Sequence, residues 1–261
     1  MSDHPVMPGA EPVSYHGSAS GVLVLHGFTG SPSSIRPIAE HLVAAGYSVE
    51  APLLPGHGTH VSDMLATGWD DWTAAAADAL DRLAERTERR VVVGLSMGGS
   101  LTLWLAARQC ADRNDASPID GVVCINPKVV AEPDEIREMA QGMVDEGDVL
   151  IPGSGNDIAK EGVTDLSYSG TPLPPALSLW EGLDALGPGL ARCDLPMLLM
   201  TSPQDHVVPP SDSDHLAQVW AGPVRRRSLD NSFHVATLDH DAEVVLAETL
   251  AFVHELLGPA R

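Results

Sequence analysis

A serine between two glycines is the first residue whose type and setting suggest covalent chemistry. Ser96 follows the apolar run Val91–Val93 and precedes an apolar segment that starts at Leu101. A buried strand, a very sharp turn and a helix in this order are typical of a nucleophile elbow, which exposes the serine hydroxyl at the carboxyl end of a sheet. Gly94 and Gly98 suit such a turn, because a Cβ at either place would collide with the neighbouring strand or helix. The pattern predicts a nucleophilic serine.

A nucleophilic serine needs a base, and the base needs an acid that orients it. Asp205 lies in the loop after a predicted strand at 195–201, and His234 lies in the loop after a predicted strand at 223–229. The carboxyl ends of parallel strands share one edge of a sheet, so these residues reach the place of Ser96 in the chain order Ser, Asp, His. We predict that His234 takes the serine proton and returns it to the leaving alcohol, while Asp205 fixes the imidazole tautomer.

Other histidines and acids compete for these two roles. We expect His206 to be loop structure, because it is too close to Asp205 in sequence to face it. The acids that flank His234 do not follow the preceding strand, and two further histidines are assigned to the last helix and expected to be solvated. These four residues are Asp230, Asp239, His240 and His254.

Acyl transfer also needs two donors for a developing oxyanion. The backbone N–H of Met97, the residue after the nucleophile, is the first candidate. The second is the backbone N–H of Phe28, in the glycine-rich loop that follows a predicted strand at 21–26. Both lie at strand ends on the edge of the sheet that carries Ser96, which favours an oxyanion hole over a plain tight turn.

Strands alternate with helices through most of the chain, which predicts an α/β fold with a mostly parallel central sheet and helices on both faces. The alternation stops at Asn126 and resumes with the predicted strand at 195–201. We interpret residues 127–190 as an insertion over the carboxyl edge of the sheet, where ligands of such folds bind. The predicted organisation is a core of 1–126 and 191–261 with a small cap at 127–190.

Composition excludes several classes of function. The chain has 261 residues, a formal charge of −21 and only two lysines, so we expect no binding to nucleic acid or to an anionic membrane surface. No apolar run approaches the ~20 residues of a membrane span, and the first residues lack the pattern of a signal peptide. Three widely spaced cysteines fit neither a disulfide framework nor a zinc site. A cytoplasmic location and no bound metal are the expectations, and the oligomeric state stays open.

These features together resemble the α/β-hydrolase family, and within it the group of bacterial monoacylglycerol lipases and small carboxylesterases. The resemblance implies a Ser–Asp–His carboxylic ester hydrolase with a small cap and no cofactor, acting on medium-chain monoacylglycerols or simple acyl esters. The motifs that carry it are His26-Gly27-Phe28-Thr29-Gly30, Gly56-His57-Gly58-Thr59-His60, Gly94-Leu95-Ser96-Met97-Gly98-Gly99, Asp205-His206-Val207-Val208-Pro209-Pro210 and Asn231-Ser232-Phe233-His234-Val235-Ala236-Thr237-Leu238-Asp239.

The predicted cap contains the candidate substrate-binding residues. The apolar residues of the cap equally suit an acyl channel and packing of the cap onto the sheet. They include Met143, Val149, Leu150, Ile151, Leu177 and Leu179. The candidate hydrogen-bond partners of a glycerol head group are Asn156, Asp157 and Asp165, although such residues more often lie on a solvated surface. The strong negative charge favours neutral substrates.

Three alternatives to ester hydrolysis stay open. One is hydrolysis of a C–C or amide bond on the same fold, and another is acyl transfer to an acceptor other than water. The non-enzyme alternative is a binding protein that keeps the fold without turnover, although no part of the predicted Ser–Asp–His set looks damaged.

Overall fold

The computed structural model describes residues 4–112, 118–153 and 156–260. Seven strands form the main sheet in the order β1-β3-β2-β4-β5-β8-β9, in which β1 is antiparallel and the others are parallel. This is the sheet that the alternation of strands and helices predicts. The bounds are β1 Val13–Tyr15, β2 Ser20–Leu25, β3 Ser48–Ala51, β4 Arg89–Leu95, β5 Gly121–Ile125, β8 Met197–Thr201 and β9 Val224–Ser228.

Burial follows position in the sheet. The central strands β2, β4, β5 and β8 are buried along almost their whole length, because helices cover both faces. The two edge strands are largely exposed, and β9 carries Arg225, Arg226 and Arg227 in succession. Charged side chains on an edge strand discourage pairing with a second sheet.

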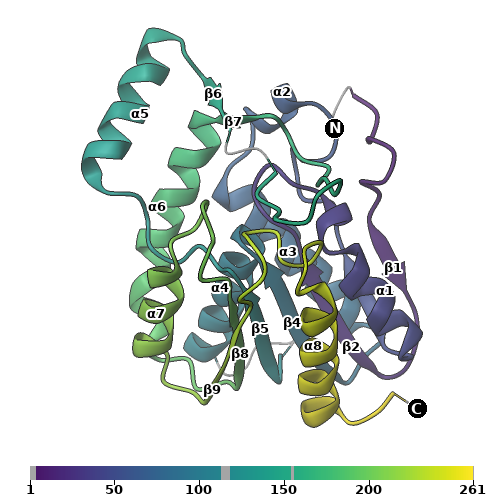
Figure 1. Ribbon diagram of the computed structural model, residues 1–261. Helices are drawn as coiled ribbons and strands as arrows, with labels where there is room; N and C mark the ends of the chain where they lie inside the picture. Colours follow the sequence, from purple (N-terminus) through teal and green to yellow (C-terminus); the bar gives the residue numbers. More distant parts are fainter. Residues whose placement is uncertain (1–3, 113–117, 154–155, 261) are drawn as a thin grey trace.

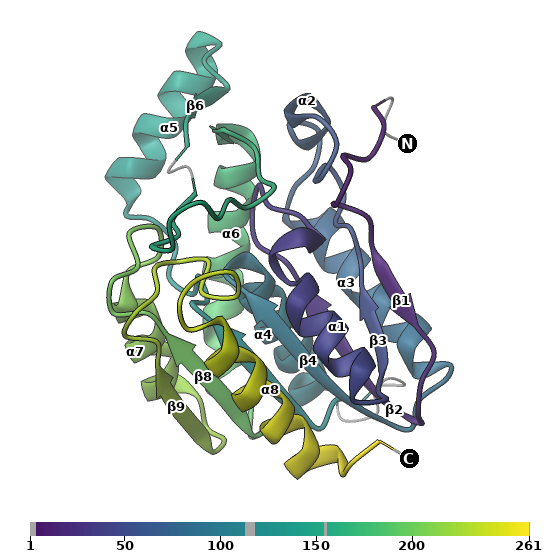
Figure 2. The same ribbon diagram turned by 45° about the vertical axis from the view of Figure 1, so that its right-hand side comes forward.

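Two hydrophobic cores lie on opposite faces of the sheet. Residues of α1 and α8 build one core, and residues of α3, α4, α6 and α7 build the other. Figures 1 and 2 show α1 and α8 side by side on one face, with α3 and α4 behind the sheet. The bounds are α1 Arg36–Ala44, α2 Val61–Met64, α3 Trp69–Ala84, α4 Met97–Ala111, α5 Asp134–Glu146, α6 Leu173–Leu190, α7 Pro210–Val219 and α8 Ala242–Leu257, with a short 3₁₀ turn at Pro32–Ser34.

The segment between β5 and β8 contains α5, α6 and a two-stranded antiparallel sheet of β6 (Leu150–Pro152) and β7 (Gly170–Pro172). Helix α5 stands beyond the edge of the main sheet, and α6 runs back from there along α4 (Figures 1 and 2). The sequence pattern predicts neither helix, because prolines and glycines interrupt it. The two prolines in the first turn of α6 are nevertheless compatible with the start of a helix.

One assignment near the carboxyl terminus is wrong. The sequence places His240 in the last helix, but α8 begins at Ala242. The backbone N–H of His240 donates to a side-chain oxygen of its neighbour Asp239. His254 does lie in α8. In the described part of the chain, no helix combines the length and the apolar character that crossing a membrane requires.

Candidate active site

Ser96 lies between β4 and α4 in a backbone conformation that residues other than glycine rarely adopt. Its φ is 57° and its ψ is −120°. The surrounding packing leaves no room for a side chain at either glycine of the turn. A Cβ on Gly98 would lie 2.1 Å from the carbonyl oxygen of Leu25, and a Cβ on Gly94 would lie 2.0 Å from the carbonyl oxygen of Gly98. Strain of this kind persists where the surrounding structure enforces it, and here it presents Ser96 at the carboxyl end of β4.

Asp205 and His234 meet although 29 residues separate them. Nδ1 of His234 lies 2.7 Å from Oδ2 of Asp205, and the carboxylate is almost fully buried. The other oxygen, Oδ1, accepts the backbone N–H groups of Val207 and Val208, each at 2.8 Å. A carboxylate held in this way accepts a hydrogen bond from the Nδ1–H group, and the Nε2 atom of His234 then has a free lone pair.

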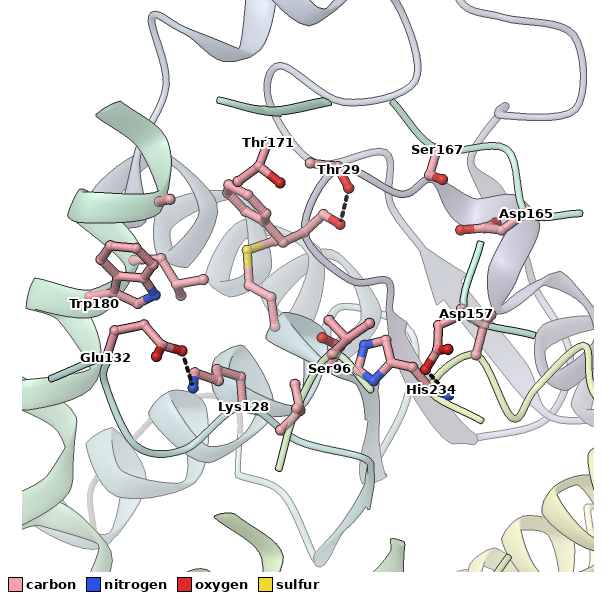
Figure 3. A pocket seen from close by; sticks show the side chains of 17 residues that line it. Thr29, Ser96, Lys128, Glu132, Asp157, Asp165, Ser167, Thr171, Trp180 and His234 are labelled. Atoms are coloured by element: carbon pink, nitrogen blue, oxygen red, sulfur yellow. Dashed lines mark hydrogen bonds and ion pairs between the residues drawn. The ribbon is translucent and has the colours of Figure 1, made fainter. Parts of the chain in front are cut away.

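Ser96 and His234 line the same cavity of about 260 Å³. The imidazole of His234 lies beside Ser96 (Figure 3). Ser96 is 8% exposed and His234 is 7% exposed, so little water surrounds the two side chains. A hydroxyl next to an imidazole whose tautomer is fixed can lose its proton to Nε2 as it attacks an electrophile.

Asn126 and Asp157 hold the loop of His234 in place, a role that the sequence did not predict for either side chain. Asn126, at the end of β5, donates from Nδ2 to the carbonyl oxygen of His234 (2.8 Å), and its Oδ1 accepts the N–H of Ser202 (2.7 Å). Asp157 accepts the N–H groups of His234 and His206, both at 3.0 Å. Asn126 therefore connects the ends of β5 and β8 to the histidine loop. Its φ of 43° lies in the left-handed region, which few residues other than glycine adopt.

Two of the competing residues, Asp239 and His206, support this loop. Asp239 accepts the backbone N–H groups of Phe233 (2.8 Å) and Ala159 (2.7 Å), so it links the histidine loop to the segment that carries Asp157. His206 pairs with Asp157 at 2.8 Å, and its ring packs edge-on against that of Phe233. His206 is therefore part of the loop scaffold, as expected.

The two predicted oxyanion donors lie on the wall of the same cavity. Met97 is the first residue of α4, and the first N–H groups of a helix have no acceptor within the helix. Phe28 lies in the loop after β2, and its ring packs edge-on against Trp72, with centroids 5.8 Å apart. Phe28 and Met97 thus line the cavity that contains Ser96, and the oxyanion hole that their N–H groups would form stays a prediction.

Two buried histidines support the loop of Phe28. His26 accepts the N–H of Leu54 at Nε2 (3.1 Å), and the ring of His57 lies edge-on to it, with centroids 5.0 Å apart. Burial, helped by the neighbouring His57, lowers the pKa of His26 to about 3, and burial lowers the pKa of His57 to about 4. Both rings are therefore neutral in the folded protein over the physiological range of pH.

This pair predicts a loss of stability in mild acid. In the unfolded chain both histidines titrate near 6.5, so the unfolded state binds more protons than the folded state between that value and about 4. Stability that is present above pH 6.5 is then lost as the pH falls. Between about pH 7.5 and about pH 5, each histidine should lower the free energy of unfolding by about 2 kcal/mol. Urea denaturation at several pH values measures this dependence.

Variants separate the buried histidines from the carboxylates, which also titrate in acid. His57→Gln should remove about 2 kcal/mol of the loss over the same interval. His215→Gln is the matched control, because His215 is an exposed residue of α7. Equal pH dependence in the two variants would show that His57 is charged in the folded protein.

The candidate substrate-binding residues lie in different places. Asp165 lines the cavity, where its Oδ1 accepts the hydroxyl of Ser33 at 3.2 Å, and burial raises its pKa. Leu177 does not line it: Leu179 and Trp180 do so from one face of α6, whereas Leu177 points to a separate surface cavity beside α5. Successive helical residues differ by about 100° in direction, which accounts for the difference.

Ile151 is also absent from the lining of this cavity. It lies on β6 opposite Thr171 of β7, and it is Thr171 that reaches the cavity (Figure 3). The apolar lining is therefore supplied mainly by α6 and by Phe28, Met97, Val207, Val208 and Val235.

Residues 22–248 match the alpha/beta hydrolase family, and the chain belongs to that family. Over 258 residues it is 38% identical to a thermostable monoacylglycerol lipase from Bacillus sp. strain H-257, with 98% of both chains covered. It is 24% identical to a carboxylesterase from Bacillus subtilis strain 168, with 94% of this chain and 97% of the relative covered. A solved structure described with the metagenome-derived lipolytic enzymes LipS and LipT is 39% identical, has a TM-score of 0.89, and covers 96% of this chain and 100% of that chain.

Proposed function

We propose that this protein hydrolyses neutral carboxylic esters, monoacylglycerols among them, through an acyl-enzyme on Ser96. The main support is the 2.7 Å hydrogen bond between Asp205 and His234 beside Ser96, in a cavity that Phe28 and Met97 also line. The similarity to a monoacylglycerol lipase over 98% of the chain supports the same class of substrate.

The proposed mechanism follows from these contacts. The hydroxyl of Ser96 attacks the ester carbonyl carbon while Nε2 of His234 takes its proton, and Asp205 stabilises the imidazolium that forms. The N–H groups of Phe28 and Met97 bind the oxyanion. His234 then gives the proton to the leaving alcohol, and an acyl-enzyme remains. Water, deprotonated by His234, attacks the acyl carbon in the second half of the reaction and releases the carboxylic acid and free Ser96.

We propose that residues 127–190 act as a cap on a core of 1–126 and 191–261. Nine of the seventeen residues that line the cavity come from this segment, although the proposed triad comes entirely from the core. In this proposal the core carries the catalytic residues, and the cap provides more than half of the residues that would contact the substrate.

In this proposal Asp165 binds the alcohol side of the substrate. The leaving oxygen must lie next to His234, because His234 protonates it. Asp165 lies on the same side of the cavity as His234 (Figure 3), close enough for His234 to influence its pKa. A carboxylate there can accept a hydroxyl of a glycerol group. The formal charge of −21 favours a neutral substrate over an anionic ester.

A panel of esters tests the proposal. Purified protein should hydrolyse monoacylglycerols and p-nitrophenyl esters, and it should release fatty acid from monoacylglycerols at least about tenfold faster than from di- and triacylglycerols, because the cavity is small and bounded by the cap. No hydrolysis of any ester, with an active C–C or amide substrate instead, would overturn it.

The same panel of esters tests whether Asp165 binds the alcohol part of the substrate. Asp165→Leu should lower kcat/KM for monoacylglycerol by about tenfold, the loss of one or two hydrogen bonds, and change the p-nitrophenyl ester much less. Asp145→Leu is the matched control, because Asp145 is an exposed acid on α5 that does not line the cavity. Equal losses of kcat/KM for both esters would show that Asp165 does not bind the glycerol group.

A further inference from the structure

A lysine and a glutamate lie in the wall of the catalytic cavity, and the proposed mechanism uses neither. Lys128 is 9% exposed, and its Nζ lies 2.8 Å from Oε1 of Glu132 and 3.8 Å from Oδ2 of Asp212. Lys128 and Glu132 both line the cavity that contains Ser96. The side chain of Lys128 is 11% exposed and that of Glu132 is 33% exposed, so placing the pair in the cavity wall costs desolvation free energy.

The pair is held firmly by its surroundings. The N–H of Lys128 donates to the carbonyl oxygen of Ser96 (3.3 Å), and its own carbonyl oxygen accepts the hydroxyl of Ser100. Asp212, at the start of α7, accepts the N–H groups of Val129 (2.8 Å) and Val130 (3.0 Å). The ammonium group therefore has two carboxylates as neighbours and a backbone that is fixed next to the nucleophile.

Lys128 and Glu132 lie on the side of the cavity away from Asp165. In Figure 3, His234 and Asp165 are on one side of Ser96, and Lys128, Glu132 and Trp180 are on the other. In the proposed mechanism the leaving alcohol occupies the side of His234, so the acyl chain of a substrate would extend toward Lys128 and Glu132. An alkyl chain that grows in that direction reaches the ion pair.

We propose that the Lys128–Glu132 pair sets the acyl specificity, which rests on the proposed ester hydrolysis. A methylene group beside the pair would displace polar surroundings from two charges without replacing their interactions, whereas an ether or hydroxyl oxygen accepts a hydrogen bond from the ammonium. The pair therefore selects short acyl chains, and chains with an uncharged oxygen at this depth, over plain alkyl chains of equal length. A terminal carboxylate is disfavoured, because one cation already faces Glu132 and Asp212.

The wild-type protein gives the first test. The substrates are p-nitrophenyl butanoate, octanoate, 4-propoxybutanoate and 6-methoxyhexanoate, where the last three have the same chain length. At least one ether ester should have a kcat/KM that equals or exceeds that of octanoate, after division by its rate of alkaline hydrolysis. In an apolar channel the octanoate would lead by about tenfold or more, since each buried methylene favours binding by about fourfold. That lead in the wild type would overturn the proposal.

A double variant gives the second test. Lys128→Met with Glu132→Met makes this wall apolar, and the octanoate-to-butanoate ratio of kcat/KM should rise at least about tenfold, the value for roughly two further buried methylenes. Arg137→Met with Asp184→Met is the matched control, because this pair joins α5 and α6 outside the cavity. The control should leave the ratio unchanged.

The outcomes of the two tests are distinct. An unchanged ratio in a double variant that still hydrolyses butanoate would overturn the role of the pair and leave the ester hydrolase intact. Absence of hydrolysis of every ester by the wild type would instead overturn the proposed function. If the double variant does not fold, the comparison of ether and alkyl esters in the wild type still decides.

Discussion

Replacing Ser96 by alanine is expected to lower kcat/KM for monoacylglycerol and p-nitrophenyl esters by about 10⁶-fold. The substitution removes the only side chain in the proposed mechanism that forms a bond to the acyl carbon. The remaining elements of the site, including the N–H groups of Phe28 and Met97, can still polarise a bound ester, so a small activity above that of water remains. The Ser96 side chain is small and its substitution leaves the turn at Gly94 and Gly98 intact, so the variant should fold.

Steady-state rates and covalent labelling measure this effect. A fluorophosphonate probe should label the wild-type protein and not Ser96→Ala, with the label located on residue 96 by peptide mass analysis. Ser62→Ala is the matched control, since Ser62 lies on α2 away from the cavity, and it should retain both labelling and activity. Labelling of Ser96→Ala at another serine would contradict the assignment of the nucleophile.

Asp205→Asn is expected to lower kcat for the same esters by about 10⁴-fold while the fold is retained. The reason lies in the contacts of this side chain. The N–H groups of Val207 and Val208 both donate to Oδ1, so an amide at this position must direct its oxygen to them and its NH₂ group to His234. Nδ1 of His234 would then act as an acceptor, and its proton would move to Nε2, which could no longer take a proton from Ser96.

Rates near neutral pH and a thermal melt of the variant test this prediction. Asp230→Asn is the matched control, because Asp230 precedes the histidine loop and is exposed, and its activity should stay within about twofold of the wild type. A modest loss in Asp205→Asn, comparable with that of the control, would mean that another acid orients His234. Asp157 would then be the next candidate, because it already binds the backbone of that loop.

The sequence by itself determined the local parts of this protein. The β-branched run before Ser96 and the glycines around it produce a strand, a strained turn and a helix, because steric limits on the backbone act between near neighbours. Alternation of strands and helices predicted the parallel sheet, and chain order predicted that Asp205 and His234 lie at its carboxyl edge. In the structure Nδ1 of His234 and Oδ2 of Asp205 lie 2.7 Å apart.

Only the tertiary structure decided which side chains share a cavity. Asn126 and Asp157 hold the loop of His234 from segments 108 and 77 residues away, and no local pattern marks them. The direction of a side chain on α6 depends on how the helix packs, so Leu179 rather than Leu177 lines the cavity. Lys128 reads in sequence as an ordinary surface lysine. Its burial beside Ser96, and with it the acyl preference that we propose, depends on contacts between distant segments, which the order of residues does not reveal.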